Sequence, residues 1–306
     1  MSRRRFVEPG RITANDRRTT RRHFLFTPDV AGKMAQIFWY CLAVAARDNN
    51  ILVHAAILLS THPHYHVTDQ DGRLPKFKEQ FHRLLALCTK ELRSWPEEVF
   101  NKSQPGEHEL VSPRAIVDSL AYLIANPALG FAVRYAKDWP GAKTLARDIG
   151  TRVIRVLRPD EFFDPTNPDW PEWIELRLVM PEILIAYYGS LEAAQEAIAK
   201  RVKEYEHEAR QEAERQGRSF AGARRVLRTE HTVRSNRREE YGELNPRFAA
   251  AGDAEAAAAA VRRFRTFNAD YDDALARWVE GDRDVIFPHG TWWMRVHHGV
   301  RCHPPP

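Results

Sequence analysis

Cysteine is scarce in this chain of 306 residues, which has only Cys41, Cys88 and Cys302. An odd number of scattered cysteines does not form a disulfide framework and is typical of a reducing compartment. The chain also lacks any run of about eighteen apolar residues, so no membrane span is expected. Its arginine-rich start is not followed by the apolar segment of a signal peptide. We therefore expect a cytoplasmic protein without a membrane partner.

A nucleotide-binding signature is missing as well. No Gly-x-x-x-x-Gly-Lys-Ser/Thr sequence is present, so ATP-driven chemistry is not expected. The net charge of +5 is moderate, and histone-like binding is not implied. Hydrophobic residues make up 43% of the chain, which is enough for a buried core. This length suits two domains, or one domain with a large extension.

The positive charge is concentrated in two segments. Residues 1–28 hold eight arginines against two acidic residues, and residues 224–238 hold six against one. Such clusters are typical of phosphate-binding surfaces, although a solvated tail or linker has the same composition. The arginines predicted to contact DNA are Arg17, Arg18, Arg21, Arg22, Arg224, Arg225 and Arg228.

Two histidines follow an apolar, strand-like run, Ile51 to Leu59. His64 and His66 are two residues apart, so in an extended chain both imidazoles lie on the same face. Neutral imidazoles on one face can hold a metal, although histidines on strands are more often packing or surface residues. His62 adds a third candidate, but Pro63 makes regular strand pairing there less favourable.

A second stretch, Tyr122 to Pro127, lies about sixty residues on. If it is helical, Tyr122 and Asn126 share a face, and a phenol and an amide oxygen can meet the histidines over one cation. Tyr122 can also be a core tyrosine, and Asn126 a helix C-cap before Pro127.

His64-Tyr65-His66 resembles the His-hydrophobic-His motif of the HUH endonucleases. Tyr122 to Pro127, followed by Asp138-Trp139-Pro140, resembles the tyrosine-helix segment of single-tyrosine transposases of the IS200 type, and most closely that of the REP-associated tyrosine transposases. The resemblance covers roughly residues 20–145. One departure is that His62-Pro63 stands where the family commonly has Pro-Asn.

This resemblance implies a metal-dependent single-strand DNA endonuclease and transposase. Tyr122 would be the nucleophile of a covalent 5′-phosphotyrosine intermediate. His64, His66 and Asn126 would bind a divalent ion, Mg²⁺ or Mn²⁺. The implied partner is single-stranded or hairpin DNA, and a homodimer is left open. The alternatives are a non-cleaving hairpin-binding protein, a relaxase or replication initiator of the same superfamily, and an unrelated metallohydrolase.

The predicted fold is α+β. The chain order predicts strands at residues 23–27, 51–60 and 64–69, a hairpin at 98–112, and helices at 30–47, 75–94 and from Pro113. This is a ferredoxin-like antiparallel sheet with helices on one face. We expect a basic flexible arm at 1–20, the HUH domain at 21–148 and a mainly helical extension at 149–306. In that extension the pattern predicts a strand at 173–179 and helices at 190–216 and 254–279.

Overall fold

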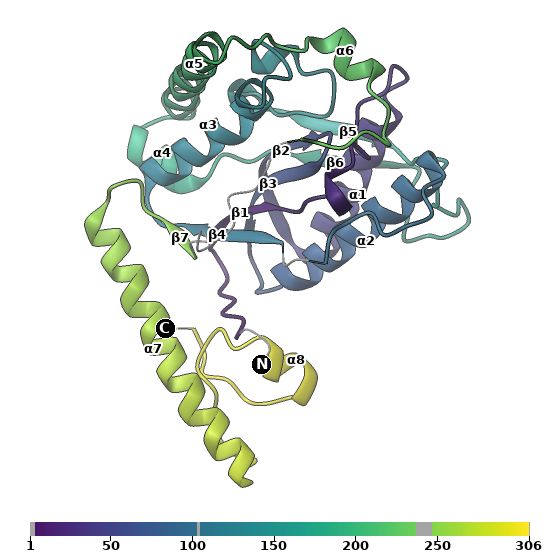
Figure 1. Cartoon of the computed structure of the whole chain (residues 1–306). Helices are drawn as coiled ribbons and strands as arrows, with labels where there is room; N and C mark the ends of the chain where they lie inside the picture. The colour runs from purple at the N-terminus through teal and green to yellow at the C-terminus, as the bar shows by residue number, and fades with distance from the viewer. Residues whose placement is uncertain (1–3, 103–104, 237–246, 306) are drawn as a thin grey trace.

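The computed structural model describes residues 4–102, 105–236 and 247–305. Its first part runs in the predicted β-α-β-β-α-β order and ends in a further helix (Figure 1). These elements are β1 (Ile12–Asp16), α1 (Lys33–Asn49), β2 (Ile51–Leu59), β3 (His62–Asp69), α2 (Leu74–Arg93), β4 (Gly106–Leu110) and α3 (Pro113–Leu129). The strands lie in the order β2-β3-β1-β4 with antiparallel neighbours, and β7 (Phe248–Ala249) adds a parallel edge to β4. The predicted ferredoxin-like α+β class is confirmed.

The first strand lies elsewhere than predicted. Residues 23–27 contain only an isolated bridge from His23 to Arg234, whereas β1 lies inside the stretch predicted as a flexible arm. β1 is short and contains only two apolar residues, so it gives no strand signal. Its backbone pairs on both sides, with β3 and with β4, and this pairing rather than side-chain pattern defines it. The predicted hairpin at 98–112 is also wrong, because β4 pairs with β1 instead.

The two faces of the sheet carry different helices. α1 and α2 cover one face, where Tyr65 and Val67 of β3 join their apolar side chains in a single cluster. α3 covers the other face, which the predicted arrangement of helices on one face did not include, and there Leu120 and Ile124 pack with Ile57 of β2. Alternate residues of β3 therefore point toward different helices. The even-numbered residues, which include the three histidines, point toward α3.

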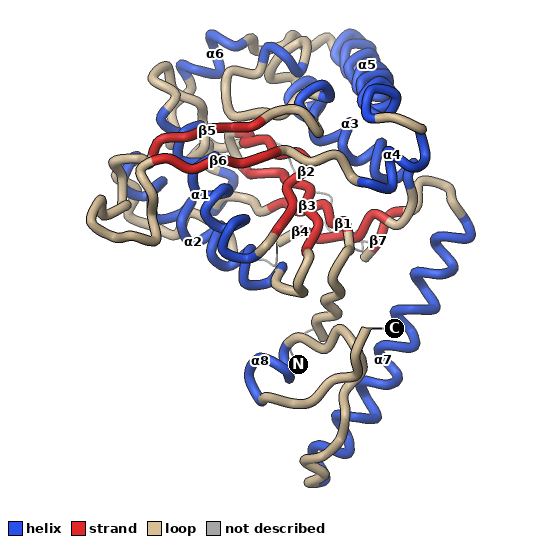
Figure 2. The backbone as a smooth tube through the Cα atoms, turned by 180° about the vertical axis from the view of Figure 1, so that it is seen from behind, coloured by secondary structure: helices blue, strands red, loops and turns tan. Residues whose placement is uncertain are grey.

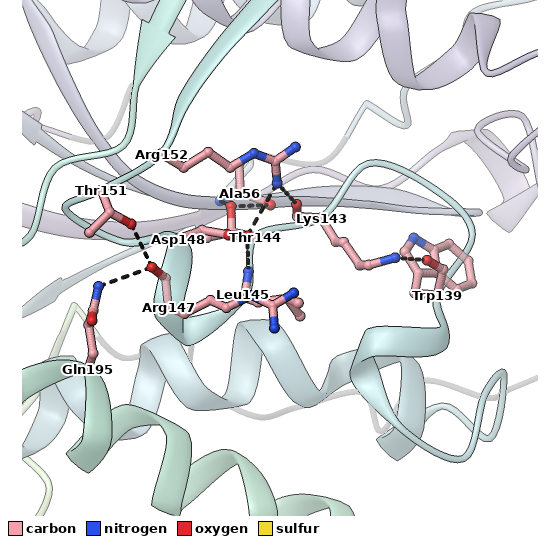
Figure 3. A network of polar contacts seen from close by, with 10 residues as sticks. All are labelled: Ala56, Trp139, Lys143, Thr144, Leu145, Arg147, Asp148, Thr151, Arg152 and Gln195. Carbon is pink, nitrogen blue, oxygen red and sulfur yellow. Dashed lines mark hydrogen bonds and ion pairs between the residues drawn. The ribbon is translucent and has the colours of Figure 1, made fainter. Parts of the chain in front are cut away.

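The segment after α3 closes the outer edge of the sheet (Figure 3). The Thr144 hydroxyl donates to the Ala56 carbonyl at 3.0 Å and accepts from the Ala56 amide at 3.1 Å. Gln195 of α5 (Leu191–Arg215) donates to the carbonyls of Arg147 and Ile149. The Thr144 bonds satisfy edge groups of β2 that would otherwise remain open, and the Gln195 bonds tie α5 to the segment after α3. Two short 3-10 helices, η2 (Ala136–Asp138) and η3 (Ala146–Asp148), lie in this segment.

Residues beyond 148 contribute to both cores. β5 (Val153–Leu157) and β6 (Trp173–Arg177) form a hairpin whose buried side chains join the α1 cluster. α5 packs along α3 through Ile198 and Val202. The helices expected at 190–216 and 254–279 are confirmed as α5 and α7 (Ala254–Glu280), and the strand expected at 173–179 as β6. The boundary near residue 148 stays a prediction.

The last elements form a unit beside the sheet (Figure 2). α7 and α8 (Trp293–His298) share a small apolar cluster into which Phe6 packs from the N-terminal segment. The remaining elements are η1 (Thr20–Arg22), α4 (Glu182–Tyr188) and α6 (Ala223–Arg228). None of the helices in the described ranges combines the length and apolar character needed to cross a membrane.

Candidate functional site

Three histidines of β3 share one face. Opposite them on β2 stand Leu59, Ile57 and Ala55, paired with His62, His64 and His66 in turn. Because directly paired residues point the same way, all three imidazoles face α3. The strand begins early enough to include His62, contrary to what Pro63 suggested.

Pro63 is tolerated because its partner on β2 needs no bond from it. The Leu58 amide donates to the Ala142 carbonyl at 3.0 Å, and the Leu58 carbonyl accepts from the Trp139 indole at 3.1 Å. Pro63 therefore removes no hydrogen bond between β2 and β3.

α3 lies across these histidines and contacts them in sequence. The Ser119 hydroxyl is 2.9 Å from Nε2 of His66. One turn on, the Tyr122 ring meets the His64 ring edge-to-face, with centroids 6.4 Å apart. Asn126 lies a further turn along the same side of α3, and its amide makes no hydrogen bond to any described residue. The structure thus brings Tyr122 to His64, while the Asn126 amide has no hydrogen-bond partner among the described residues.

Tyr122 is presented to solvent rather than buried. Its side chain is 44% exposed, which excludes the core reading left open by the sequence. It also meets Tyr205 of α5, with ring centroids 5.9 Å apart. Pro127 lies inside α3, so Asn126 is not a C-cap.

Tyr205, the α5 residue that contacts Tyr122, is fixed in place by polar neighbours. The Tyr205 hydroxyl donates to Asp118 of α3 at 2.9 Å, and Arg201 donates to the same carboxylate at 2.8 Å. The Arg201 guanidinium lies 3.9 Å from the Tyr205 ring centroid. Burial, assisted by the bond to Asp118, raises the pKa of Tyr205 to about 12, so this phenol stays neutral. The sequence did not predict this group, because Tyr205 was distinguished only by its helical spacing from the apolar residues Ile198 and Val202.

The histidines are held in the form that binds metals. Burial lowers the pKa of His64, and it lowers the pKa of His66 well below its usual value. Both are therefore neutral near pH 7 and keep a lone pair for coordination. Nδ1 of His66 is buried and has no hydrogen-bond partner among the residues that the structure describes. A buried polar atom of this kind costs free energy unless something binds it, so the donor set suits a metal.

Amide and water oxygens would have to complete such a site. Within the described residues, no three histidine, cysteine, aspartate or glutamate side chains are grouped closely enough to hold a metal ion. Asn126 is the nearest match to a third protein ligand by position on α3. Its coordination, and the choice between His62 and His66 as the partner of His64, stay predictions. His62 lies beside His64, with ring centroids 4.5 Å apart.

Two further polar residues reach the same face from β1 and β4. Asp16 pairs with His64, and His108 stands beside Ala14 in the row of His66. A Cβ on Gly106 would clash with the Asp16 carboxylate as it now stands, so a larger residue at this position would displace that side chain. Neither residue was singled out from the sequence, because β1 itself was not predicted.

The N-terminal arginines differ in their availability. The Arg17 guanidinium packs over Phe100, 4.7 Å from its ring centroid, and burial lowers its pKa. Arg17 therefore has a packing role in addition to any phosphate contact. Arg18 is close enough to His64 to lower the pKa of that histidine, in opposition to Asp16. Arg21 is exposed and forms an ion pair with Glu97 at 3.4 Å.

The second arginine cluster folds back to the first. The Phe24 amide donates to the Val233 carbonyl at 2.8 Å, and the Ser235 amide to the Arg22 carbonyl at 3.1 Å. α6 precedes this segment and begins where the amides of Ala221 and Gly222 bond to the loop after α3. Arg224, Arg225 and Arg228 are exposed and have no ion pair with any described residue. Arg237 and Arg238 lie outside the described residues.

No protein-family model matches the chain, and no curated protein matches it. Among solved structures, the chain is similar to one titled "Structure of the REP associates tyrosine transposase bound to a REP hairpin". The identity is 18% and the TM-score 0.41, over 56% of this chain and 97% of that chain. What this chain does must therefore follow from its own side chains.

Proposed function

We propose that the chain is a metal-dependent single-strand DNA endonuclease and transposase with Tyr122 as its nucleophile. One observation carries this proposal. An exposed tyrosine lies beside His64 in a row of histidines, and Arg18 is close enough to His64 to lower the pKa of that histidine.

The chemistry is a phosphoryl transfer in two balanced steps. The Tyr122 oxygen attacks a DNA phosphorus and forms a P–O bond while the bond to the 3′ oxygen breaks. The phenol loses its proton, the 3′ oxygen gains one, and a 5′-phosphotyrosine and a free 3′-hydroxyl result. In the second step a 3′-hydroxyl attacks the phosphotyrosine and releases Tyr122. The ester energy is retained throughout, so no ATP is consumed.

The remaining residues position the DNA and its charge. His64, His66 and Asn126 would hold the ion, and a bound Mg²⁺ or Mn²⁺ would polarise the non-bridging oxygens of the phosphate under attack. Tyr205 supports the Tyr122 ring from α5. Arg18, Arg21 and the three arginines of α6 are suited to bind the phosphates of single-stranded or hairpin DNA.

A second candidate is a non-cleaving hairpin-binding protein. It is favoured by the Ser119 hydroxyl on Nε2 of His66, which competes with a metal for that nitrogen. Such a protein would keep the arginine surface without using Tyr122.

Covalent trapping separates the two functions. End-labelled single-stranded oligonucleotides with hairpins are incubated with the full-length protein and Mn²⁺ or Mg²⁺, then run on a denaturing gel. A transposase gives a metal-dependent shifted band that is absent in Tyr122→Phe and retained in Tyr135→Phe, a control tyrosine 36% exposed. DNA binding without any adduct would favour the hairpin-binding protein.

A further inference from the structure

A cleft of about 790 Å³ separates the sheet from the C-terminal unit. One wall is the start of α2, with Leu74, Pro75 and Lys76, and the opposite wall is α8. The N-terminal segment with Arg5 lines the same space. The site around Tyr122 uses none of these residues, because it occupies the α3 face.

The α8 wall presents an aromatic surface. Trp293 is 42% exposed, and its ring lies against that of His297, with centroids 3.8 Å apart and planes at 35°. Trp292 is buried behind it, and the Arg5 guanidinium lies 5.4 Å from the Trp292 ring centroid. A half-exposed indole fixed by a neighbouring ring is suited to stack on a flat apolar ligand.

The charge of the cleft favours an anionic ligand. Seven lysine and arginine side chains line it against five carboxylates. Most of these carboxylates are already engaged: Glu8 and Glu109 bind Arg11 and Arg263, Glu107 binds Lys78, and Asp69 accepts from amides at the start of α2. Glu79 is the carboxylate without a described partner. Arg5 and Lys76 are exposed and have no ion pair within the described residues.

We propose that this cleft binds an unpaired nucleic-acid strand, with a base stacked on Trp293 and phosphates on Arg5 and Lys76. The choice of nucleic acid as the ligand rests on the proposed function. The lining continues to Arg17 and Pro105, and Arg17 follows Asp16, the residue paired with His64. The Arg17 side chain packs on Phe100 and contacts His82, so this end of the cleft lies on the α1 and α2 face of the sheet, opposite the histidines.

Binding is measured with full-length Tyr122→Phe protein in EDTA, so that no cleavage is required. Fluorescence anisotropy follows a labelled, unpaired oligothymidylate. Trp293→Ala and Lys76→Glu should each weaken binding by at least about fivefold, as expected for loss of one stacked base or one phosphate contact. The matched control is Trp173→Ala, because Trp173 is 46% exposed and also lies beside an arginine, but is not part of the cleft.

Ultraviolet cross-linking gives a second readout that folding defects do not imitate. The cross-linked base should appear on the tryptic peptide of residues 284–295. The proposal is overturned if Trp293→Ala binds within twofold of Trp173→Ala, or if the base cross-links only elsewhere. Neither measurement needs a covalent adduct. The cleft can therefore bind DNA even if Tyr122 does not react, and Tyr122 can form an adduct even if the cleft does not bind DNA, so the two proposals fail separately.

Discussion

Tyr122 has aromatic neighbours on two sides, His64 from the sheet and Tyr205 from α5. Both contacts are edge-to-face, a favourable geometry that fixes a ring without burying its hydroxyl. A nucleophile held in this way loses little orientational freedom before it reacts. In the proposed reaction, the α5 residues would therefore act through Tyr122, as positioning residues.

Removing the Tyr205 ring should slow adduct formation. Tyr205→Ala is expected to reduce the rate of formation roughly tenfold, because the Tyr122 ring gains freedom. Tyr205→Phe keeps the ring and should remain within about threefold of the native rate. Single-turnover adduct formation at saturating oligonucleotide checks this. Equal rates in both variants would show that Tyr205 has no positioning role.

His54 makes the stability of the fold depend on pH. It occupies the bulge of β2, and its Nδ1 donates to the Val179 carbonyl at 2.7 Å while Nε2 accepts from Thr68 at 2.7 Å. Burial lowers its pKa to about 4, against about 6.5 in an unfolded chain. The unfolded state therefore binds the extra proton as the pH falls. The stability is complete above about pH 6.5 and decreases toward pH 4.

We expect about 3 kcal/mol of unfolding free energy to be lost through His54 across this range. Urea denaturation at pH 7.0, 5.5 and 4.5 measures it. In His54→Gln, whose amide can keep both bonds, the loss on acidification should be smaller by a similar amount. Parallel pH profiles for the two proteins would exclude His54 as the cause.

At the scale of elements, α6 is the clearest addition to the basic surface. Its three arginines are exposed without described partners, and the following segment joins residues 22–24. Two clusters that are about 200 residues apart in the chain thereby become neighbours. The sequence indicated each arginine cluster but not that the two lie side by side. Their proximity depends on isolated backbone hydrogen bonds in an irregular segment, which leave no pattern in the sequence.

Replacing Arg224, Arg225 and Arg228 by alanine should weaken single-stranded DNA binding and flatten its salt dependence. Each lost phosphate contact reduces the slope of log K against log salt by about 0.7, so a decrease of about 2 is expected. Titrations between 50 and 300 mM salt measure the slope. A control with alanine at the exposed Arg147, Arg155 and Arg177 should keep the native slope, and a loss shared by both triples would contradict a role for α6.

The elements that the sequence predicted are those with a strong apolar period. α2 and α5 bury one side along their length, α1 is buried on nearly all sides, and α7 buries a stripe between Ala260 and Ala274. All residues of β2 but one are buried. β1 was not predicted, because its residues are mostly polar and it depends on pairing with strands distant in sequence. Asp16 and His108 were not predicted as site residues for the same reason. The sequence therefore predicted the histidines of this face but not the polar residues beside them.

At the scale of the whole molecule, the C-terminal unit is joined to the sheet mainly by polar contacts. Arg263 of α7 binds Glu8 and Glu109, and Phe6 stacks on Phe267 with centroids 4.1 Å apart. Burial raises the pKa of Glu109, with Arg263 opposing this effect. Without Arg263, the mostly buried Glu109 carboxylate would lose the positive charge that does most to offset its burial.

Arg263→Ala should therefore loosen the C-terminal unit at a cost of about 3 kcal/mol. Hydrogen exchange of α7, α8 and residues 4–8 should accelerate, while α1 and α3 keep their protection. Arg262→Ala, at a neighbouring position that forms no described ion pair, serves as the control. Uniform acceleration across the whole chain would contradict a separate C-terminal unit.

The most direct test of the account is to locate the DNA on the protein. After reaction with Mn²⁺ and a single-stranded hairpin substrate, the adduct is digested with nuclease and trypsin and analysed by mass spectrometry. Residues 115–134 form one tryptic peptide in which Tyr122 is the only tyrosine. We predict a nucleotide mass on this peptide, dependent on the metal and absent in Tyr122→Phe. A nucleotide on any other peptide, or none although DNA is bound, would contradict the proposed role of Tyr122.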